Sequence, residues 1–215
     1  LKSSYLTLSS CIECCKCGCF ADANTLLRKY RDDLFFILYI LVYKDSQQFG
    51  KIDEMEKNIE KWLNNNLSNL NISEVLKTIA TSPNLSETVK KYKLKTYFDD
   101  INSRLNDYVH GNGRIYYNKN ANGYNADELI STLNKIIDDA RYTTTTFTFL
   151  LSLCSPYLIS STDYIDCLDL DISPTEGSQY RVAPFVENSF RKNIEVIDSN
   201  GIEYLAQKTY MIFSD

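Results

Sequence analysis

The chain has 215 residues, of which 44% are apolar and 24% charged, with a net charge of −5 and only 7 Gly and 4 Pro. This composition excludes an intrinsically disordered or collagen-like chain, and it argues against a loop-rich or all-β fold. It also argues against a protein that coats DNA non-specifically, because that function needs a basic surface. The sequence contains one histidine, so a single chain cannot build a metal site from several histidines.

Five of the seven cysteines lie close together in the segment CIECCKCGC, which begins at Cys11. Cys11, Cys14, Cys17 and Cys19 have a spacing that zinc accepts, but structural zinc sites usually take a second ligand pair from a distant segment, and none exists here. Cys11, Cys15 and Cys19 recur every four residues, so we favour one buried face of a helix and expect no metal or other cofactor. An odd, clustered set of cysteines is unlike a secreted disulfide framework and indicates a reducing cytoplasm.

Apolar residues recur at helical spacing from Cys11 to Tyr43, which predicts helix throughout this stretch. Its longest apolar run, Leu34–Tyr43, is half of what a bilayer requires, so we expect no membrane association. Further helices are predicted over about 52–70 and 73–81, and Pro83 ends the second of them.

The segment Ser86–His110 contains neither Gly nor Pro, and it predicts one helix with Ser86 as its N-cap. Gly111 occupies the position where a glycine commonly terminates a helix. A loop rich in Gly and Asn is expected over 111–125.

The pattern after this loop is again helical. A long helix is predicted from about Ala126 to Ser155, although its threonine run Thr143–Thr146 would also suit a strand. Residues 171–181 form a second predicted loop. Pro184 suits the first turn of a helix that runs to about Ile197, and Asn200-Gly201 leads into a last helix through Tyr210.

The acidic segment DYIDCLDLD, residues 163–171, lacks the glycine and terminal glutamate of a calcium-binding loop. We interpret it as the polar face of a short helix. The sequence contains no P-loop, dinucleotide-binding glycine motif or nucleophile elbow.

These patterns predict an all-α fold with a single domain over 1–215. Its core would comprise about 11–155, with long antiparallel helices, and residues 156–215 would form a helical extension. A boundary within 111–125 is the plausible alternative, but the flanking helices are long enough to pair with each other.

The charge is unevenly distributed: residues 1–110 have a net charge of +1 and residues 111–215 a net charge of −6. Residues 86–119 contain seven basic residues against four acidic ones. A local basic strip on an acidic protein suits a short anionic ligand. The basic residues are Lys90, Lys91, Lys93, Lys95, Arg104, Arg114 and Lys119.

The segment RLNDYVHGNG places Arg104 six residues before His110, at the predicted end of a helix and the start of a glycine loop. This arrangement resembles the arginine–histidine motif of the HEPN superfamily, and the upstream segment ANTLLRKYRDDLFFILYI resembles HEPN-type proteins of bacteria. The resemblance covers about residues 11–155. It implies a helical bundle that cleaves RNA without metal as a homodimer, in phage defence or in toxin–antitoxin modules.

The resemblance assigns His110 as the acid/base group and Arg104 as the phosphate clamp. Histidine titrates near neutrality, arginine binds phosphate through paired N–H donors, and RNA supplies its own 2′-hydroxyl nucleophile. Further RNA- or phosphate-binding residues would be Asn106, Asp107, Asn112 and Arg114.

The family usually carries a polar residue directly after the arginine, whereas this chain has Leu105. This departure favours an alternative: a catalytically inactive HEPN-like module that binds RNA, a nucleotide or a protein partner such as an antitoxin. Two structural interpretations also remain, in which His110 only caps its helix and Arg104 only pairs with Asp100 or Tyr108 one turn away.

Helical geometry separates Arg104 and His110 by about 120° around a straight helix and by roughly 9 Å along it. The two side chains would then not converge on one phosphate. Either the helix frays at its end or the partner residue comes from a second chain, which favours a homodimer with a composite site. Upstream, we expect Arg28, Arg31, Asp32 and Asp33 to form an inward-facing ion-pair network or to support the site.

Overall fold

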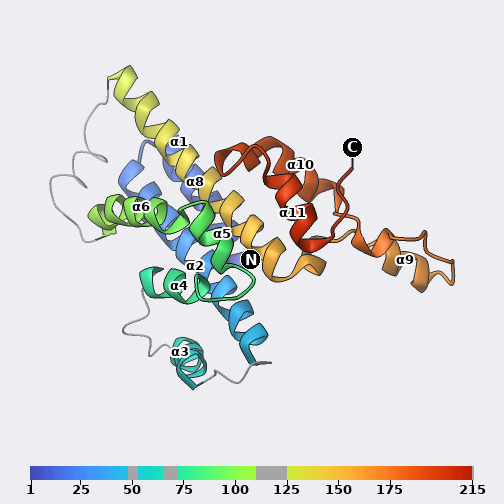
Figure 1. Cartoon of the computed structure of the whole chain (residues 1–215). Coiled ribbons are helices and arrows are strands. Elements are labelled where there is room, and N and C mark those ends of the chain that lie inside the picture. Colours follow the sequence, from blue (N-terminus) through green and yellow to red (C-terminus); the bar gives the residue numbers. More distant parts are fainter. Residues whose placement is uncertain (48–52, 65–71, 110–124, 215) are drawn as a thin grey trace. The chain divides into compact units, whose positions relative to one another are not determined.

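The computed structural model describes residues 1–47, 53–64, 72–109 and 125–214. Within these ranges the chain has ten α-helices, three short 3₁₀ turns and no strand, so the predicted all-α class is confirmed (Figure 1). The specific HEPN-like bundle stays a prediction.

No helix in the described ranges is both long and apolar enough to cross a membrane.

The chain divides into two compact units, Leu1–Thr143 and Thr144–Asp215, and the division falls inside helix α8 (Ala126–Cys154). The prediction of a single domain stays a prediction.

The first unit begins with a helical hairpin, α1 (Lys2–Lys16) and α2 (Phe20–Gln47). Gly18 adopts a left-handed φ of 75°, its N–H donates to Cys15 O, and the Cys19 N–H donates to Cys14 O. This pair of bonds is the Schellman ending of a helix. The predicted continuous helix from Cys11 to Tyr43 is therefore wrong, because the chain reverses at Gly18.

The reversal also corrects the prediction that Cys11, Cys15 and Cys19 share one buried face of a helix. Cys11 is buried in α1 and its thiol lies 3.2 Å from the carbonyl oxygen of Ala23 in α2, whereas Cys19 lies beyond the end of α1. Cys11 therefore helps to join the two arms of the hairpin.

Helix α2 contacts α1, α3 (Asp53–Leu63), α4 (Ile72–Ile79) and α6 (Leu94–Val109) (Figure 1). Its buried side chains, each no more than 3% exposed, form the centre of the core. They are Leu27, Leu34, Phe35, Leu38 and Tyr39. The ring of Phe35 packs edge-on against Phe98 of α6, with ring centroids 4.5 Å apart.

The segment predicted as one helix over Ser86–His110 is two helices, α5 (Ser86–Lys91) and α6, which meet at Lys93 with a φ of 50°. Leu94 lies nine positions after Leu85, which would put these leucines about 180° apart on a straight helix. Both are buried, at 0% and 1% exposure, so the break turns the second leucine back to the core. Ser86 is not the N-cap, since Leu85 holds that position without a side-chain cap bond.

The long helix predicted over Ala126–Ser155 is confirmed as α8, and the threonine run Thr143–Thr146 is helical. Asn125 caps it: its side-chain oxygen accepts a 2.9 Å hydrogen bond from the N–H of Glu128. In the first unit, Tyr142 of α8 stacks on Tyr97 of α6, with ring centroids 3.4 Å apart.

The second unit contains α9 (Asp163–Asp169), α10 (Pro184–Asn193) and α11 (Gly201–Thr209) after the end of α8. The predicted short acidic helix and the start of a helix at Pro184 are confirmed, although α10 ends at Asn193 and a 3₁₀ turn follows. Phe149, Phe190, Ile194 and Leu205 form its core, each no more than 3% exposed. Gly201 is required because a Cβ there would lie 2.5 Å from Ile194 Cγ1.

Candidate functional site

The motif residue Arg104 is held in place by two carboxylates. Its Nη1 and Nη2 donate to Asp139 of α8 at 2.7 and 3.1 Å, and its Nε donates to Asp100 at 3.2 Å. The predicted pairing with Asp100 is therefore confirmed. Asp139, 1% exposed, is the stronger partner, because a two-pronged contact to a carboxylate is both directional and charge-assisted.

The surroundings of this ion pair fix the protonation states of Arg104 and of the neighbouring Tyr97. Burial lowers the pKa of Arg104, but Asp139 and then Asp100 outweigh it, so the pKa of Arg104 rises. Burial and the charge of Asp139 raise the pKa of Tyr97, whose hydroxyl lies 3.4 Å from the Asp139 carboxylate. Arg104 therefore stays charged and Tyr97 stays neutral at physiological pH.

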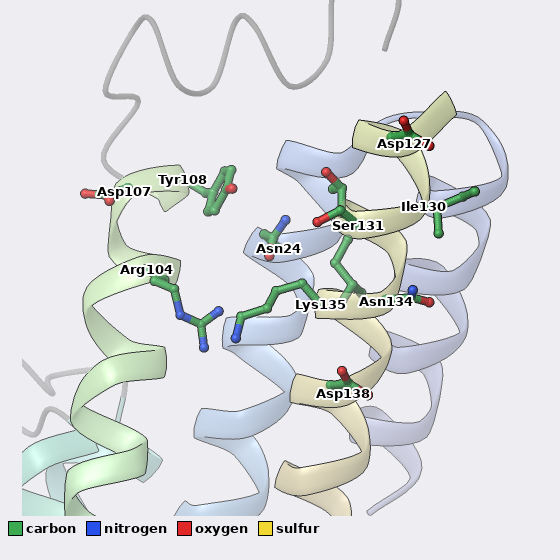
Figure 2. Close-up of a pocket in the computed structure, with 12 residues that line it drawn as sticks. Asn24, Arg104, Asp107, Tyr108, Asp127, Ile130, Ser131, Asn134, Lys135 and Asp138 are labelled. Carbon is green, nitrogen blue, oxygen red and sulfur yellow. The ribbon is translucent and has the colours of Figure 1, made fainter. Parts of the chain in front are cut away.

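Arg104 also borders a cavity of about 700 Å³ between α6 and α8. Figure 2 shows the Arg104 guanidinium and the Lys135 ammonium extending from these two helices into the same space, with Asn24 of α2 beside them. Lys135 is exposed and, within the described part of the chain, has no ion pair. The lining comprises Asn24, Arg104, Asp107, Tyr108, Asp127, Ile130, Ser131, Thr132, Asn134, Lys135, Ile136 and Asp138.

Tyr108 adds a hydroxyl donor to this cavity. Burial raises its pKa, and the nearby Arg104 charge opposes that rise only in part. Its hydroxyl therefore remains protonated near neutrality and can donate a hydrogen bond to an anionic group. Among the described residues, the cavity thus has one cation without an ion pair, one paired cation and a phenol, but three carboxylates also border it.

The predicted site residues do not all come together. Arg104 and Asp107 line the cavity, although the Asp107 carboxylate points away from it in Figure 2. Asn106 lies on another face of α6, where it lines a second cavity, and its buried Oδ1 has no hydrogen-bond partner among the described residues. The separation follows from the 100° turn per helical residue. His110, Asn112 and Arg114 lie outside the described residues.

Sequence reasoning missed Asp139, Lys135 and Tyr108. Asp139 interrupts the buried stripe of α8 between Ile136 and Tyr142, and a carboxylate at such a position signals a buried cationic partner. The identity of that partner, 35 residues away in sequence, has no local signal.

The cysteine segment gives no metal site in the described ranges, where no three His, Cys, Asp or Glu side chains are grouped to hold an ion. None of the seven cysteines forms a disulfide. Burial, followed by the influence of Cys15, raises the pKa of Cys11 to about 12. This thiol therefore stays protonated at neutral pH.

Comparison of the chain with known protein families, with curated proteins and with solved structures yields no match.

Proposed function

We propose that the chain is a metal-independent endoribonuclease of the HEPN type. The observation that supports it is the position of Arg104: it borders an open cavity on α6, the helix whose last described residue directly precedes the only histidine of the chain. Its charge is fixed by Asp139 and Asp100, and Lys135 supplies a second cation to the same space.

The proposed reaction needs three functions. A base takes the proton of the RNA 2′-hydroxyl, the 2′-oxygen attacks the adjacent phosphorus, and an acid protonates the 5′-oxygen as its bond to phosphorus breaks. The products are a 2′,3′-cyclic phosphate and a 5′-hydroxyl end. His110 would serve as acid or base, and Arg104 and Lys135 would stabilise charge on the phosphorane.

A second candidate is a catalytically inactive HEPN-like module that binds RNA, a nucleotide or a protein partner. Two observations favour it. The guanidinium of Arg104 already has two carboxylate partners, and Leu105, at the position where the family carries a polar residue, is fully buried. In this case the cavity would bind an anionic group without cleaving it.

The test is cleavage of total RNA by the purified protein in EDTA, with the wild type beside His110→Ala, Lys135→Gln and Arg104→Lys. We expect cleavage that leaves cyclic phosphate ends, loss of it in His110→Ala, and weaker cleavage in the two cation variants. Arg104→Lys keeps the positive charge but loses the paired N–H donors of the guanidinium. Lys95→Gln, an exposed position of α6 outside the cavity, is the matched control.

The outcomes separate the two candidates. Cleavage unchanged in His110→Ala would refute the proposed catalytic residue. Absence of cleavage, combined with RNA binding that weakens in Lys135→Gln but not in Lys95→Gln, would establish the binding module instead.

A further inference from the structure

The first unit contains a second cavity, of about 600 Å³, that runs along one face of α2. Arg28, Asp32, Phe36 and Ile40 recur every four residues on this face and all line the cavity. At 1.5 Å per residue, Arg28 lies about 12 Å from Phe36 and about 18 Å from Ile40 along the helix. The cavity is therefore elongated, and its chemistry changes from one end to the other.

One end is polar and carries an unbalanced positive charge. Arg31 is fully buried, and its Nε and Nη2 both donate to Asp32 Oδ1, at 2.9 and 2.7 Å. Arg28 Nε lies 3.7 Å from the other oxygen of Asp32. Two guanidiniums thus share one carboxylate. Asp33 also lines the cavity and pairs with Lys29, so the charged group from Arg28 to Asp33 keeps one net positive charge.

The same end has unused hydrogen-bonding atoms. Arg28 and Asn106 both line this cavity, and the buried atoms Arg28 Nη1 and Asn106 Oδ1 have no hydrogen-bond partner in the described part of the chain. Asn102 also lines the cavity, and its Oδ1 accepts a 3.2 Å bond from Arg31. Buried polar groups without partners cost free energy, and their presence points to a ligand that supplies the partners.

The other end is apolar. Phe36, Ile37 and Ile40 of α2 line it together with Ile72 and Val75 of α4, and with Trp62 of α3. Phe36 and Trp62 contact each other, with ring centroids 4.6 Å apart. Because the two rings already pack together, they do not form a slot for a planar base, and the aliphatic side chains around them suit an alkyl chain.

We propose that this cavity binds a small acidic amphiphile: an anionic head with a hydroxyl or amide N–H beside it, joined to an alkyl body. Arg28 and the Asn102 amide would bind the anionic oxygens, Asn106 Oδ1 would accept from the adjacent donor, and Phe36, Ile40 and Trp62 would enclose the chain. The negative head compensates the second guanidinium, which has no carboxylate of its own. This site is separate from the α6–α8 cavity and does not depend on the RNA proposal.

Trp62 is the only tryptophan of the chain, lines this apolar end and is 45% exposed. Its fluorescence therefore reports occupancy. The probes are 2-hydroxydecanoate, decanoate and decan-1-ol, each titrated below its critical micelle concentration. We expect saturable one-to-one binding with a blue shift, and an order of affinity in which 2-hydroxydecanoate exceeds decanoate and decanoate exceeds decan-1-ol.

Substitutions test which side chains contact the anionic head of the ligand. Arg28→Gln should weaken binding of both carboxylates about tenfold or more, because a charge-assisted hydrogen bond is lost. Asn106→Leu should abolish the difference between 2-hydroxydecanoate and decanoate while the free protein stays folded, since Asn106 Oδ1 has no hydrogen-bond partner in the described part of the chain. Lys44→Gln, at an exposed position further along α2 and outside the cavity, should bind like the wild type.

Three results would overturn the proposal: decan-1-ol binding as tightly as decanoate, Arg28→Gln binding as tightly as Lys44→Gln, or no spectral response to any probe. A response to adenosine monophosphate but to none of the alkyl probes would also overturn it, in favour of a nucleotide. Circular dichroism of each variant separates lost binding from lost fold.

Discussion

At the scale of single residues, Arg104 shows how a candidate catalytic group can also be a structural one. Its guanidinium joins α6 to α8 through a carboxylate that is almost completely buried, and its remaining surface faces a cavity. Removing Arg104 would therefore affect stability and function together. The contribution of the ion pair to folding is better measured by replacing its other member, Asp139.

We expect Asp139→Asn to lower the free energy of unfolding by about 1–2 kcal/mol, because Arg104 loses its buried counter-charge but stays partly solvated. Urea denaturation measures this loss. The neighbouring Asp138→Asn, at an exposed position, should change stability by no more than about 0.5 kcal/mol. Equal stabilities of the two variants would show that the pair contributes nothing to folding.

The buried thiol of Cys11 predicts how the free energy of unfolding depends on pH. Burial raises its pKa from the ordinary 9.0 to about 12, and a thiol exposed by unfolding loses its proton at the lower value. The unfolded state therefore binds fewer protons between these two values, so the stability contributed by Cys11 is complete below about pH 9 and is lost as the pH rises toward 12.

The measurement is the free energy of unfolding against pH for the wild type and for Cys11→Ala. The stability difference between them should shrink as the pH rises above 9. Cys17→Ala, at an exposed position, should run parallel to the wild type. Parallel curves for all three proteins would contradict the assignment.

At the scale of elements, two helices predicted as continuous, over Cys11–Tyr43 and Ser86–His110, each break at a left-handed residue. At Gly18 the residue type suits the conformation, since glycine has no Cβ to clash. Lysine does not suit the left-handed conformation of residue 93. The helix breaks there because the break allows both Leu85 and Leu94 to be buried.

Lys93→Gly should therefore raise the free energy of unfolding by about 0.5–1 kcal/mol, because glycine adopts this φ without strain. Lys95→Gly, two residues further and inside α6, should instead lower it by about 1 kcal/mol. Thermal or urea unfolding of the pair checks the sign. If both substitutions destabilise equally, residue 93 is not left-handed in solution.

At the scale of the whole molecule, the RNA proposal depends on how Arg104 meets His110. The two residues lie about 120° apart on an ideal helix, so we expect the active unit to be a homodimer in which one chain supplies each residue. A site shared between two chains can be recognised because two different variants restore activity when they are mixed.

Mixing the weakened variant Arg104→Lys with the inactive His110→Ala should then raise cleavage above that of either variant, because free subunit exchange in a twofold dimer rebuilds about a quarter of the wild-type sites. The measurement is RNA cleavage of the mixture after exchange, with each variant alone as control. A mixture no more active than the average of its components, or a monomer in light scattering at working concentration, would argue against the composite site.

The sequence by itself determined the all-α class, the long helix α8 and the helix start at Pro184, and it limited the partner of Arg104 on its own helix to Asp100 or Tyr108. Each of these follows from local information: a 3.6-residue period, a fixed proline φ, or neighbours one helical turn apart. It also identified the charged group on α2 from Arg28 to Asp33.

Only the tertiary structure decided the break at Lys93, the partnership of Arg104 with Asp139, and the separation of Asn106 from Arg104 into two different cavities. These features depend on which face of each helix becomes buried and on which distant side chain arrives opposite it. Periodicity shows that a helix has an apolar face, but the partners that a polar residue meets beside that face are fixed by packing between helices.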